Sequence, residues 1–402
     1  MTVRIQPGLL RGTVAAPPSK SQAHRLLLCA ALSEGASRVR GVSDSQDVLA
    51  TLDCISALGC HVRRNGDTVT VSGGLRPIPA GTVFPCRESG STLRFFIPLT
   101  LVHGGSAVFT GSKRLMQRGV SVYEALFREK GIALVSSPAS LTVTGQLKPG
   151  EYTVPGDVSS QFVSGLLFAL PLLPGDSLLR VLPPVESRPY IRLTLDALRR
   201  FGVTVREVEE NTYRIPGNQH VLPQDVTVEG DWSNAAVLLA FRALGNELTV
   251  TGLNPESAQG DRVFPALLDR LSEPQPKLDL SDCPDLAPVL FAAAAIRHGA
   301  VFTGTRRLRL KESDRAGAMS EELRKFGIRC EVEENRVTVF PGALRKPLQP
   351  LESHNDHRIV MALALLCAQT GGEIEGAEAV AKSYPDFFRT LRTLGLEIAE
   401  IP

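Results

Sequence analysis

The chain has 402 residues, 43% apolar and 21% charged, which is typical of a globular protein but too long for one ordinary core. A net charge of +2 argues against a general nucleic-acid surface or a polybasic membrane face, so an anion site has to be built from individually placed cations. Seven cysteines without a Cys-x-x-Cys pair favour reduced thiols. No apolar run reaches transmembrane length and no targeting pattern is present, so we expect a cytoplasmic protein without a membrane or nucleic-acid partner.

The first predicted element is a helix that begins near Ser19 and ends before Gly35. The Pro-Pro-Ser sequence before Lys20 is typical of a capped helix start, and the apolar run from Leu26 to Leu32 follows it. Lys20 falls in the first turn, where the helix dipole is already positive, so its position is unfavourable unless an anion binds there. For one isolated stretch a solvated basic turn is the simpler interpretation. The rest of the chain repeats the arrangement.

A glycine that ends an apolar helix and opens a short strand recurs six times along the chain. The intervals between these glycines are 70, 70, 70, 54 and 73 residues. The repeated glycines are Gly35, Gly105, Gly175, Gly245, Gly299 and Gly372. A second amphipathic helix and alternating segments such as Thr68–Ser72 follow within the unit, which predicts helix, strand, helix, strand, strand. Six such units are most simply two domains of three, with a continuous solenoid as the alternative. The fourth unit is shorter and lacks a clear terminal pair of strands.

The first helix of each unit opens on polar residues. Simple capping explains Asp231 and Asp282, but not the arginines in the same turns, namely Arg25, Arg94 and Arg358. The loops after the first strands add further cations, including Arg118, Lys311, Arg315 and Lys382. If the helices of a domain are parallel, their N-termini and these cations make a cleft suited to phosphates and carboxylates.

Two carboxylates, Asp285 and Glu312, lie within this basic pattern of the fifth unit. They are candidates for proton transfer. The alternative is that each is only the salt-bridge partner of a neighbouring arginine, which for Glu312 is an equally good interpretation. His354-x-x-His357 lacks the spacing of a helical zinc pair, so we predict no metal site. No P-loop, Gly-x-Gly-x-x-Gly or Gly-x-Ser-x-Gly motif is present, which leaves nucleotide and acyl-serine chemistry without support.

These motifs resemble, in order, those of the 5-enolpyruvylshikimate-3-phosphate synthases, an enolpyruvyl transferase family. The resemblance covers nearly the whole chain and is carried by Pro18–Arg25, Gly90–Arg94, Ser159–Gln161, Lys311–Arg315 and Asn355–Arg358. It implies an α/β fold of two domains, each with three βαβαββ units around a pseudo-threefold axis, and an active site in the interdomain cleft. The expected domains are residues 18–228 and residues 1–17 plus 229–402, the first residues completing the C-terminal domain.

The resemblance also implies the reaction. The enolpyruvyl group of phosphoenolpyruvate would pass to the hydroxyl of shikimate 3-phosphate, with release of phosphate, in aromatic amino-acid biosynthesis and without a cofactor or metal. Asp285 would accept the hydroxyl proton, Glu312 would protonate the methylene carbon, and Lys20 would also be catalytic. The expected shikimate 3-phosphate residues are Lys20, Ser21, Arg25, Ser159, Ser160, Gln161, Ser187, Asp285 and Lys311. Those for phosphoenolpyruvate are Lys20, Gly90, Arg118, Gln161, Arg315, Arg358 and Lys382. We expect a monomer.

Two residues depart from the family pattern. Glu88 stands where many members have asparagine, and Arg307 stands where some have an asparagine that contacts shikimate 3-phosphate. The nearest alternative is the sister family that transfers enolpyruvate to UDP-N-acetylglucosamine, whose reactive cysteine has no counterpart in Gly111–Val120. A repeat-built phosphate- or RNA-binding protein is the alternative of another class, and the low net charge and 5% aromatic content count against it.

Overall fold

The computed structural model describes residues 1–401, which form two compact units. The N-terminal domain comprises residues 20–229, and the C-terminal domain comprises residues 1–19 with the chain from residue 230 onward. The chain therefore passes between the domains twice, at 19/20 and at 229/230, where the sequence had suggested 17/18 and 228/229. Each domain has its own apolar core, which excludes the continuous solenoid.

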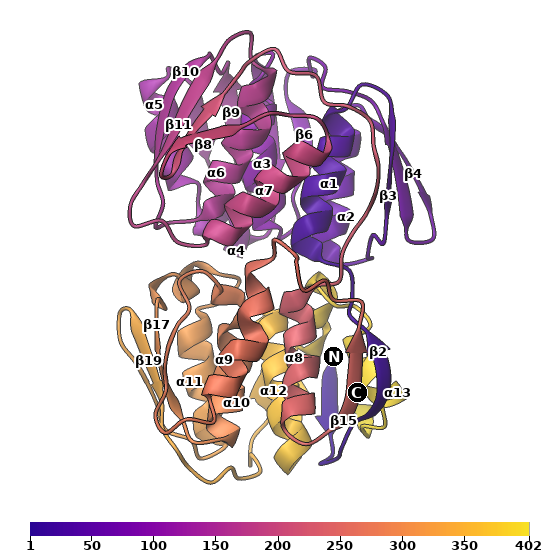
Figure 1. Ribbon diagram of the computed structural model, residues 1–402, viewed down its shortest axis with the longest axis vertical. Coiled ribbons are helices and arrows are strands. Elements are labelled where there is room, and N and C mark those ends of the chain that lie inside the picture. Colours follow the sequence, from indigo (N-terminus) through magenta and orange to yellow (C-terminus); the bar gives the residue numbers. More distant parts are fainter. Residues whose placement is uncertain (402) are drawn as a thin grey trace. The chain divides into compact units, whose positions relative to one another are not determined.

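The N-terminal domain contains seven α-helices (Figure 1): α1 (Lys20–Leu32), α2 (Gln46–Ala57), α3 (Gly90–Leu99), α4 (Lys113–Arg118), α5 (Ser121–Glu129), α6 (Ser160–Ala169) and α7 (Arg188–Arg200). A 3-10 turn, η1 (Leu170–Leu172), extends α6. Its strands form three four-stranded sheets. They are β14 (Asp225–Thr227), β3 (Ala36–Arg40), β5 (Thr68–Ser72) and β4 (His61–Asn65); β6 (Thr82–Pro85), β7 (Gly105–Thr110), β9 (Ser140–Gly145) and β8 (Ala133–Ser136); and β10 (Gly150–Pro155), β11 (Ser177–Leu182), β13 (Thr212–Ile215) and β12 (Arg206–Glu209), each in spatial order.

Each sheet of the N-terminal domain contains the four strands of one βαβαββ unit. Its first two strands are parallel and its last two antiparallel, as in β6–β7 and β8–β9. The first helix of each unit, namely α1, α3 or α6, is almost completely buried, because its apolar residues occupy all sides. The first unit takes its first strand, β14, from the end of the domain, where Asp225–Thr227 pairs with Arg38–Arg40. The three units are therefore closed into a ring.

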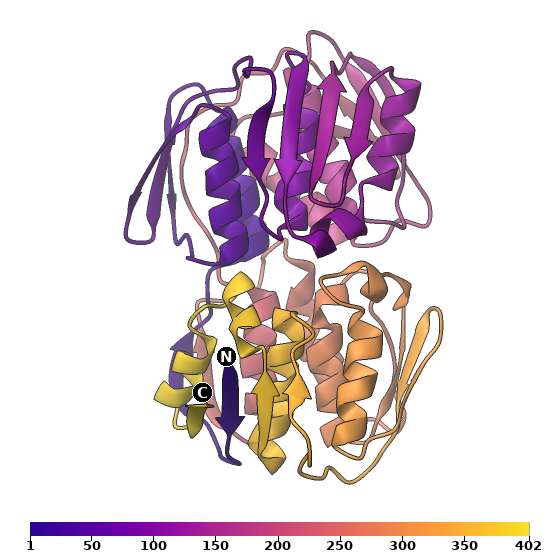
Figure 2. The ribbon, with the colours of Figure 1, turned by 180° about the vertical axis from the view of Figure 1, so that it is seen from behind.

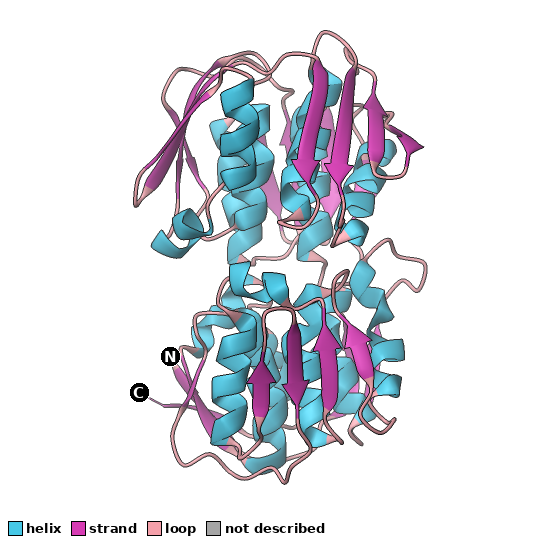
Figure 3. Ribbon diagram, turned by 90° about the vertical axis from the view of Figure 1, so that its left-hand side faces the viewer, coloured by secondary structure: helices cyan, strands magenta, loops and turns pink. Residues whose placement is uncertain are grey.

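The C-terminal domain has the same plan with one reduced unit. Its α-helices are α8 (Trp232–Ala243), α9 (Phe264–Arg270), α10 (Ala287–Ile296), α11 (Arg315–Lys325), α12 (His357–Thr370) and α13 (Phe387–Thr393). Its 3-10 turns are η2 (Gly260–Val263), η3 (Pro284–Leu286), η4 (Arg306–Leu310) and η5 (Ala377–Lys382). In Figure 3 strands of each domain lie over its helices.

Two of its sheets have four strands and one has two. In spatial order they are β16 (Lys277–Asp279), β17 (Ala300–Thr303), β19 (Arg336–Val339) and β18 (Cys330–Val332); β20 (Leu351–Glu352), β21 (Gly372–Glu375), β1 (Thr2–Ile5) and β22 (Ile398–Ile401); and β15 (Glu247–Thr251) with β2 (Arg11–Ala15). The two-stranded sheet belongs to the fourth unit, as its missing strand pair predicted. The indigo strand β1 lies beside the yellow strands of the chain's end in Figure 2. The first residues thus complete this domain.

Candidate active site

In the N-terminal domain the first turns of α3 and α6 meet around two arginines. Arg94 donates from Nη1 to Oε1 of Gln161 at 2.7 Å and from Nη2 to the carbonyl of Gly119 at 2.9 Å. Gln161 in turn donates to Oγ of Ser91 at 3.0 Å, so the two helix starts are tied together. A methyl group on Gly90 would lie 2.7 Å from Nη1 of Arg94 and 2.9 Å from Nη2 of Arg118. Two guanidinium groups therefore border the N-terminal end of the α3 backbone, where the helix dipole adds positive potential.

The start of α1 places the predicted lysine beside a carboxylate that the sequence did not identify. Nζ of Lys20 is 2.8 Å from Oδ2 of Asp47 on α2, and both side chains are largely buried. Ser21 follows in the same turn, and its carbonyl accepts from Nη1 of Arg25 at 2.6 Å. No sequence signal indicated Asp47, because it lies 27 residues from Lys20 on another helix.

Arg25 ties α1 to α7. Its Nε donates to Oγ1 of Thr194 at 2.8 Å, its Nη2 donates to the carbonyl of Tyr190 at 3.0 Å, and its guanidinium lies over the ring of Phe95. Burial lowers the pKa of Arg25 to about 10, while Tyr190 and Cys29 oppose that shift. The side chain thus supports the helix start as well as adding charge to it.

The three remaining predicted serines lie at the starts of α6 and α7. Ser159 caps α6 and accepts from the backbone N–H of Gln161 at 3.3 Å, and Ser160 is the first residue of the helix. Ser187 precedes α7 with a left-handed backbone, φ 57°, and is buried. Short hydroxyl side chains at helix starts suit both capping and hydrogen bonding to an anion.

In the C-terminal domain, Arg315 gathers three carboxylates. Its Nη1 lies 2.8 Å from Oδ1 of Asp285, its Nη2 lies 2.8 Å from Oε2 of Glu312, and its Nε lies 2.9 Å from Oδ2 of Asp356. Only 1% of the Arg315 side chain is exposed. Burial alone would lower its pKa, but the three carboxylates outweigh burial and raise the pKa well above its usual value. The two predicted proton-transfer groups therefore share one cation, which also satisfies the salt-bridge interpretation.

Lys311 contacts the same oxygen of Asp285 as Arg315 does. Its Nζ is 3.1 Å from Oδ1 of Asp285. Burial lowers the pKa of Lys311, the charge of Asp285 opposes that shift, and Arg315 and Arg307 add to it. Asp285 itself lies in the turn η3 just before α10. Asp282, expected to cap a helix, is not at a cap position, because Cys283 precedes η3 as its cap residue and Leu286 is the cap residue of α10.

The remaining predicted residues, Arg358 and Lys382, lie at the start of α12 and close to it. Asp356 caps this helix through the backbone N–H of Arg358 at 2.9 Å and also accepts from Ser313. Arg358 is buried, and its Nε and Nη1 have no hydrogen-bond partner among residues 1–401. Lys382, at the end of η5, donates from Nζ to the carbonyl of Asn355. Asp356 was part of the recognised motif, but only the fold shows that it joins Arg315 to α12.

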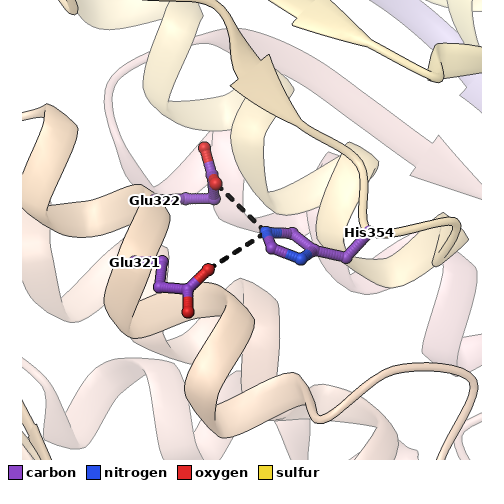
Figure 4. A group of neighbouring side chains, drawn as sticks. All are labelled: Glu321, Glu322 and His354. Atoms are coloured by element: carbon purple, nitrogen blue, oxygen red, sulfur yellow. Dashed lines mark hydrogen bonds and ion pairs between the residues drawn. The ribbon is translucent and has the colours of Figure 1, made fainter.

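One cluster next to this region resembles a cation site. Among residues 1–401 the only group of three possible metal ligands is Glu321, Glu322 and His354 (Figure 4). Glu322 already accepts from His354 at 3.1 Å and lies 2.9 Å from Nζ of Lys325. The Lys325 ammonium thus already neutralises Glu322, and these residues form a salt-bridge network. His357 is not part of the group.

The two departures from the family pattern are also placed by the structure. Arg307 is buried in η4 and donates from Nη2 to the carbonyl of Ser281 at 2.8 Å, and its charge reaches Lys311. Arg307 is therefore a further cation near Lys311. Glu88 immediately precedes the α3 cap, Ser89.

Comparisons with known proteins agree with this arrangement. Residues 5–391 match the model of the family described as EPSP synthase (3-phosphoshikimate 1-carboxyvinyltransferase). The 3-phosphoshikimate 1-carboxyvinyltransferase of Clostridium kluyveri is 40% identical, over 99% of this chain and 98% of that protein. The protein of the same name from Clostridium perfringens (strain 13 / Type A) is 37% identical, over 98% of each chain.

Solved structures show the same fold. An EPSP synthase from Acinetobacter baumannii superposes with a TM-score of 0.80 at 24% identity, covering 99% of this chain and 100% of that one. The enolpyruvyl transferase NikO from Streptomyces tendae gives 0.73 at 18% identity, covering 99% and 98%. Within residues 1–401, every helix is too short or too polar to cross a membrane. The family match over almost the whole length and the 40% identical relative together show that the chain belongs to the EPSP synthase family.

Proposed function

We propose that this enzyme transfers the enolpyruvyl group of phosphoenolpyruvate to the hydroxyl of shikimate 3-phosphate and releases inorganic phosphate. The observation that carries the proposal is Arg315, which holds Asp285 and Glu312 at 2.8 Å each within a set of cations. The two substrates bring two phosphates and two carboxylates, so a site for both needs many cations. It also needs one group that accepts a proton and one that donates it.

The reaction is an addition followed by an elimination. The hydroxyl oxygen bonds to the carbon that carries the phosphate while the methylene carbon takes up a proton. The phosphate then leaves with its bonding oxygen, and the former methylene carbon loses a proton, which restores the double bond. We assign removal of the hydroxyl proton to Asp285 and proton transfer at the methylene carbon to Glu312. The shared guanidinium of Arg315 holds both groups in fixed positions, which is how an enzyme lowers the barrier for such a step.

The anionic groups are assigned to the remaining clusters. Lys20, Ser21, Arg25, Ser159, Ser160, Gln161, Ser187 and Lys311 would bind shikimate 3-phosphate. Lys20, Gly90, Arg118, Gln161, Arg315, Arg358 and Lys382 would bind phosphoenolpyruvate, and Lys20 would also take part in catalysis. The helix starts around Gly90 and Ser160 and the buried guanidinium of Arg358 support these assignments. We further propose that the protein acts as a monomer in the cytoplasm.

The test is release of phosphate from phosphoenolpyruvate with each candidate acceptor. We expect phosphate and the enolpyruvyl ether in equal amounts with shikimate 3-phosphate, and neither product with UDP-N-acetylglucosamine or without an acceptor. Transfer to the nucleotide sugar instead would assign the chain to the sister activity. Sedimentation of the purified protein at several concentrations tests whether it is monomeric.

A further inference from the structure

The loop before α12 has an unfavourable backbone. His354 and Asn355 are consecutive non-glycine residues with φ values of 49° and 52°. L-residues rarely adopt this left-handed conformation, asparagine more readily than histidine, and it persists where surrounding contacts impose it. Such strain at a functional site calls for a group that holds the loop in place.

Glu322 on α11 is that group. Its Oε1 accepts from Nε2 of His354 at 3.1 Å, and its Oε2 accepts from the backbone N–H of Glu352 at 3.1 Å. It thus binds the chain on both sides of Ser353. The Glu322 side chain is 1% exposed and the His354 side chain is 19% exposed, so water competes little for this contact.

The loop that Glu322 holds carries three contacts of the candidate active site. The carbonyl of Asn355 accepts from Lys382, and Asp356 accepts from Arg315. Asp356 also caps α12 at Arg358. A change in the backbone at 354 and 355 would therefore move the partner of Lys382 and the start of the helix that carries Arg358.

We propose that His354, bound to Glu322, is a positioning residue that fixes Lys382 and Arg358 for the phosphoenolpyruvate part of the site. This inference rests on the proposed function, since it is that function which assigns Lys382 and Arg358 to phosphoenolpyruvate. His354 itself does not touch the reacting atoms in this account. It acts through the loop and the cap of α12.

The charge on His354 gives the proposal a dependence on pH. The hydrogen bond to Glu322 raises the pKa of His354 above its ordinary value, burial opposes the shift, and the charges of Glu322, Glu352 and Glu321 add to it. The charged groups that act on the ring are Glu321 and Glu322 on α11 and Glu352 on β20, and Lys325 on α11 pairs with Glu322. Because the folded pKa is the higher one, the contact is fully formed below the unfolded value of about 6.5 and weakens as pH rises through the folded value.

The experiment compares His354→Ala, His354→Gln and Glu322→Gln with the wild type, using steady-state kinetics in both substrates. A matched control is Glu321→Gln, because that carboxylate is 59% exposed and 3.9 Å from His354. For His354→Ala we expect the KM for phosphoenolpyruvate to rise ~10-fold, as for other lost supporting contacts, and the KM for shikimate 3-phosphate to change less than about twofold. Glutamine keeps a donor, so His354→Gln should recover most of the loss.

The pH profile separates positioning from a general structural role. In the wild type the KM for phosphoenolpyruvate should rise with pH through the titration of His354, followed by NMR of its ring. In His354→Gln this rise should be absent, and in Glu322→Gln the ring should titrate at lower pH. Equal changes in both KM values, or parallel profiles for wild type and His354→Gln, would overturn the proposal.

The proposed function can be wrong independently of the positioning role of His354. It is wrong if the wild type releases no phosphate with shikimate 3-phosphate. The positioning role is then decided by calorimetric binding of phosphoenolpyruvate alone. Weaker binding by His354→Ala than by Glu321→Gln supports it, and equal binding by the two overturns it.

Discussion

Replacing Asp285 by asparagine should separate its proposed catalytic role from its structural one. The amide oxygen can still accept from Nζ of Lys311 and from Nη1 of Arg315, which lie 3.1 and 2.8 Å from Oδ1 in the wild type. The amide cannot take up the hydroxyl proton at neutral pH. Loss of a general base typically slows the reaction ~10²–10⁴-fold, which corresponds to about 3–5 kcal/mol in the barrier.

The effect of this substitution on stability should be much smaller. Arg315 keeps two carboxylate partners, at 2.8 Å and 2.9 Å. A charge-assisted hydrogen bond contributes only about 1 kcal/mol more than a neutral one, so we expect the melting temperature to fall by roughly 2–4 °C. The assay is kcat from phosphate release, with melting temperature and shikimate 3-phosphate binding measured on the same sample.

A control for Asp285→Asn is Asp282→Asn, an exposed aspartate three residues earlier, which should retain nearly full turnover. If kcat of Asp285→Asn stayed within about threefold of the wild type, Asp285 would not be the base. A large loss in both variants would point instead to disturbance of the turn before α10.

Three further outcomes are expected. Gly90→Ala should raise the KM for phosphoenolpyruvate several-fold, because the added methyl group would lie 2.7 Å from Arg94 and 2.9 Å from Arg118 and would displace one of them. An equal rise in the KM for shikimate 3-phosphate would mean that the substitution disturbs the fold. Burial first, and then neighbouring cations, lower the pKa of His24 well below 6.5, so wild-type stability should fall by about 1.4 kcal/mol per pH unit as pH drops below about 6.5. His24→Gln should remove this slope in urea unfolding at pH 7.5 and 5.5, and parallel slopes would contradict the assignment. Arg315→Met leaves three carboxylates without their shared cation and should lower the free energy of unfolding by roughly 3–5 kcal/mol in calorimetry. A decrease below about 1 kcal/mol would refute the view that Arg315 organises these carboxylates.

The sequence predicted the repeated architecture because its signals are local. Glycine ends the helices, and alternating residues such as Thr68–Ser72 form a strand with the predicted bounds. The closing strands could not be derived in this way. Thr2–Ile5 pairs with Gly372–Glu375, and Asp225–Thr227 with Arg38–Arg40, across distances along the chain at which no periodicity is informative. For β1, only the family resemblance indicated the pairing.

In the candidate site, too, local sequence signals predicted some features, whereas contacts between distant residues could not be predicted. Residues at helix starts could be identified from sequence, because cations there are unusual. Their partners could not. Asp47 lies on a different helix from Lys20, and His24 hydrogen-bonds Thr51 at 2.6 Å, which in turn bonds Thr92 near the start of α3 at 2.8 Å. This buried chain joins three helices through residues with no motif of their own.

The structure also distinguishes two arginines that the resemblance treats alike. Each nitrogen of Arg315 contacts a carboxylate, so a phosphate or carboxylate ligand would have to compete with Asp285, Glu312 or Asp356 for it. Arg358 is likewise buried, but two of its nitrogens have no hydrogen-bond partner among residues 1–401. A buried guanidinium without partners is unfavourable until an anion binds, whereas one shared by three carboxylates is already satisfied. It follows that Arg358 is the better candidate for direct contact with phosphoenolpyruvate. Arg315, which the proposed function also assigns to phosphoenolpyruvate, would then contribute mainly by holding the base and the acid of the proposed reaction in place.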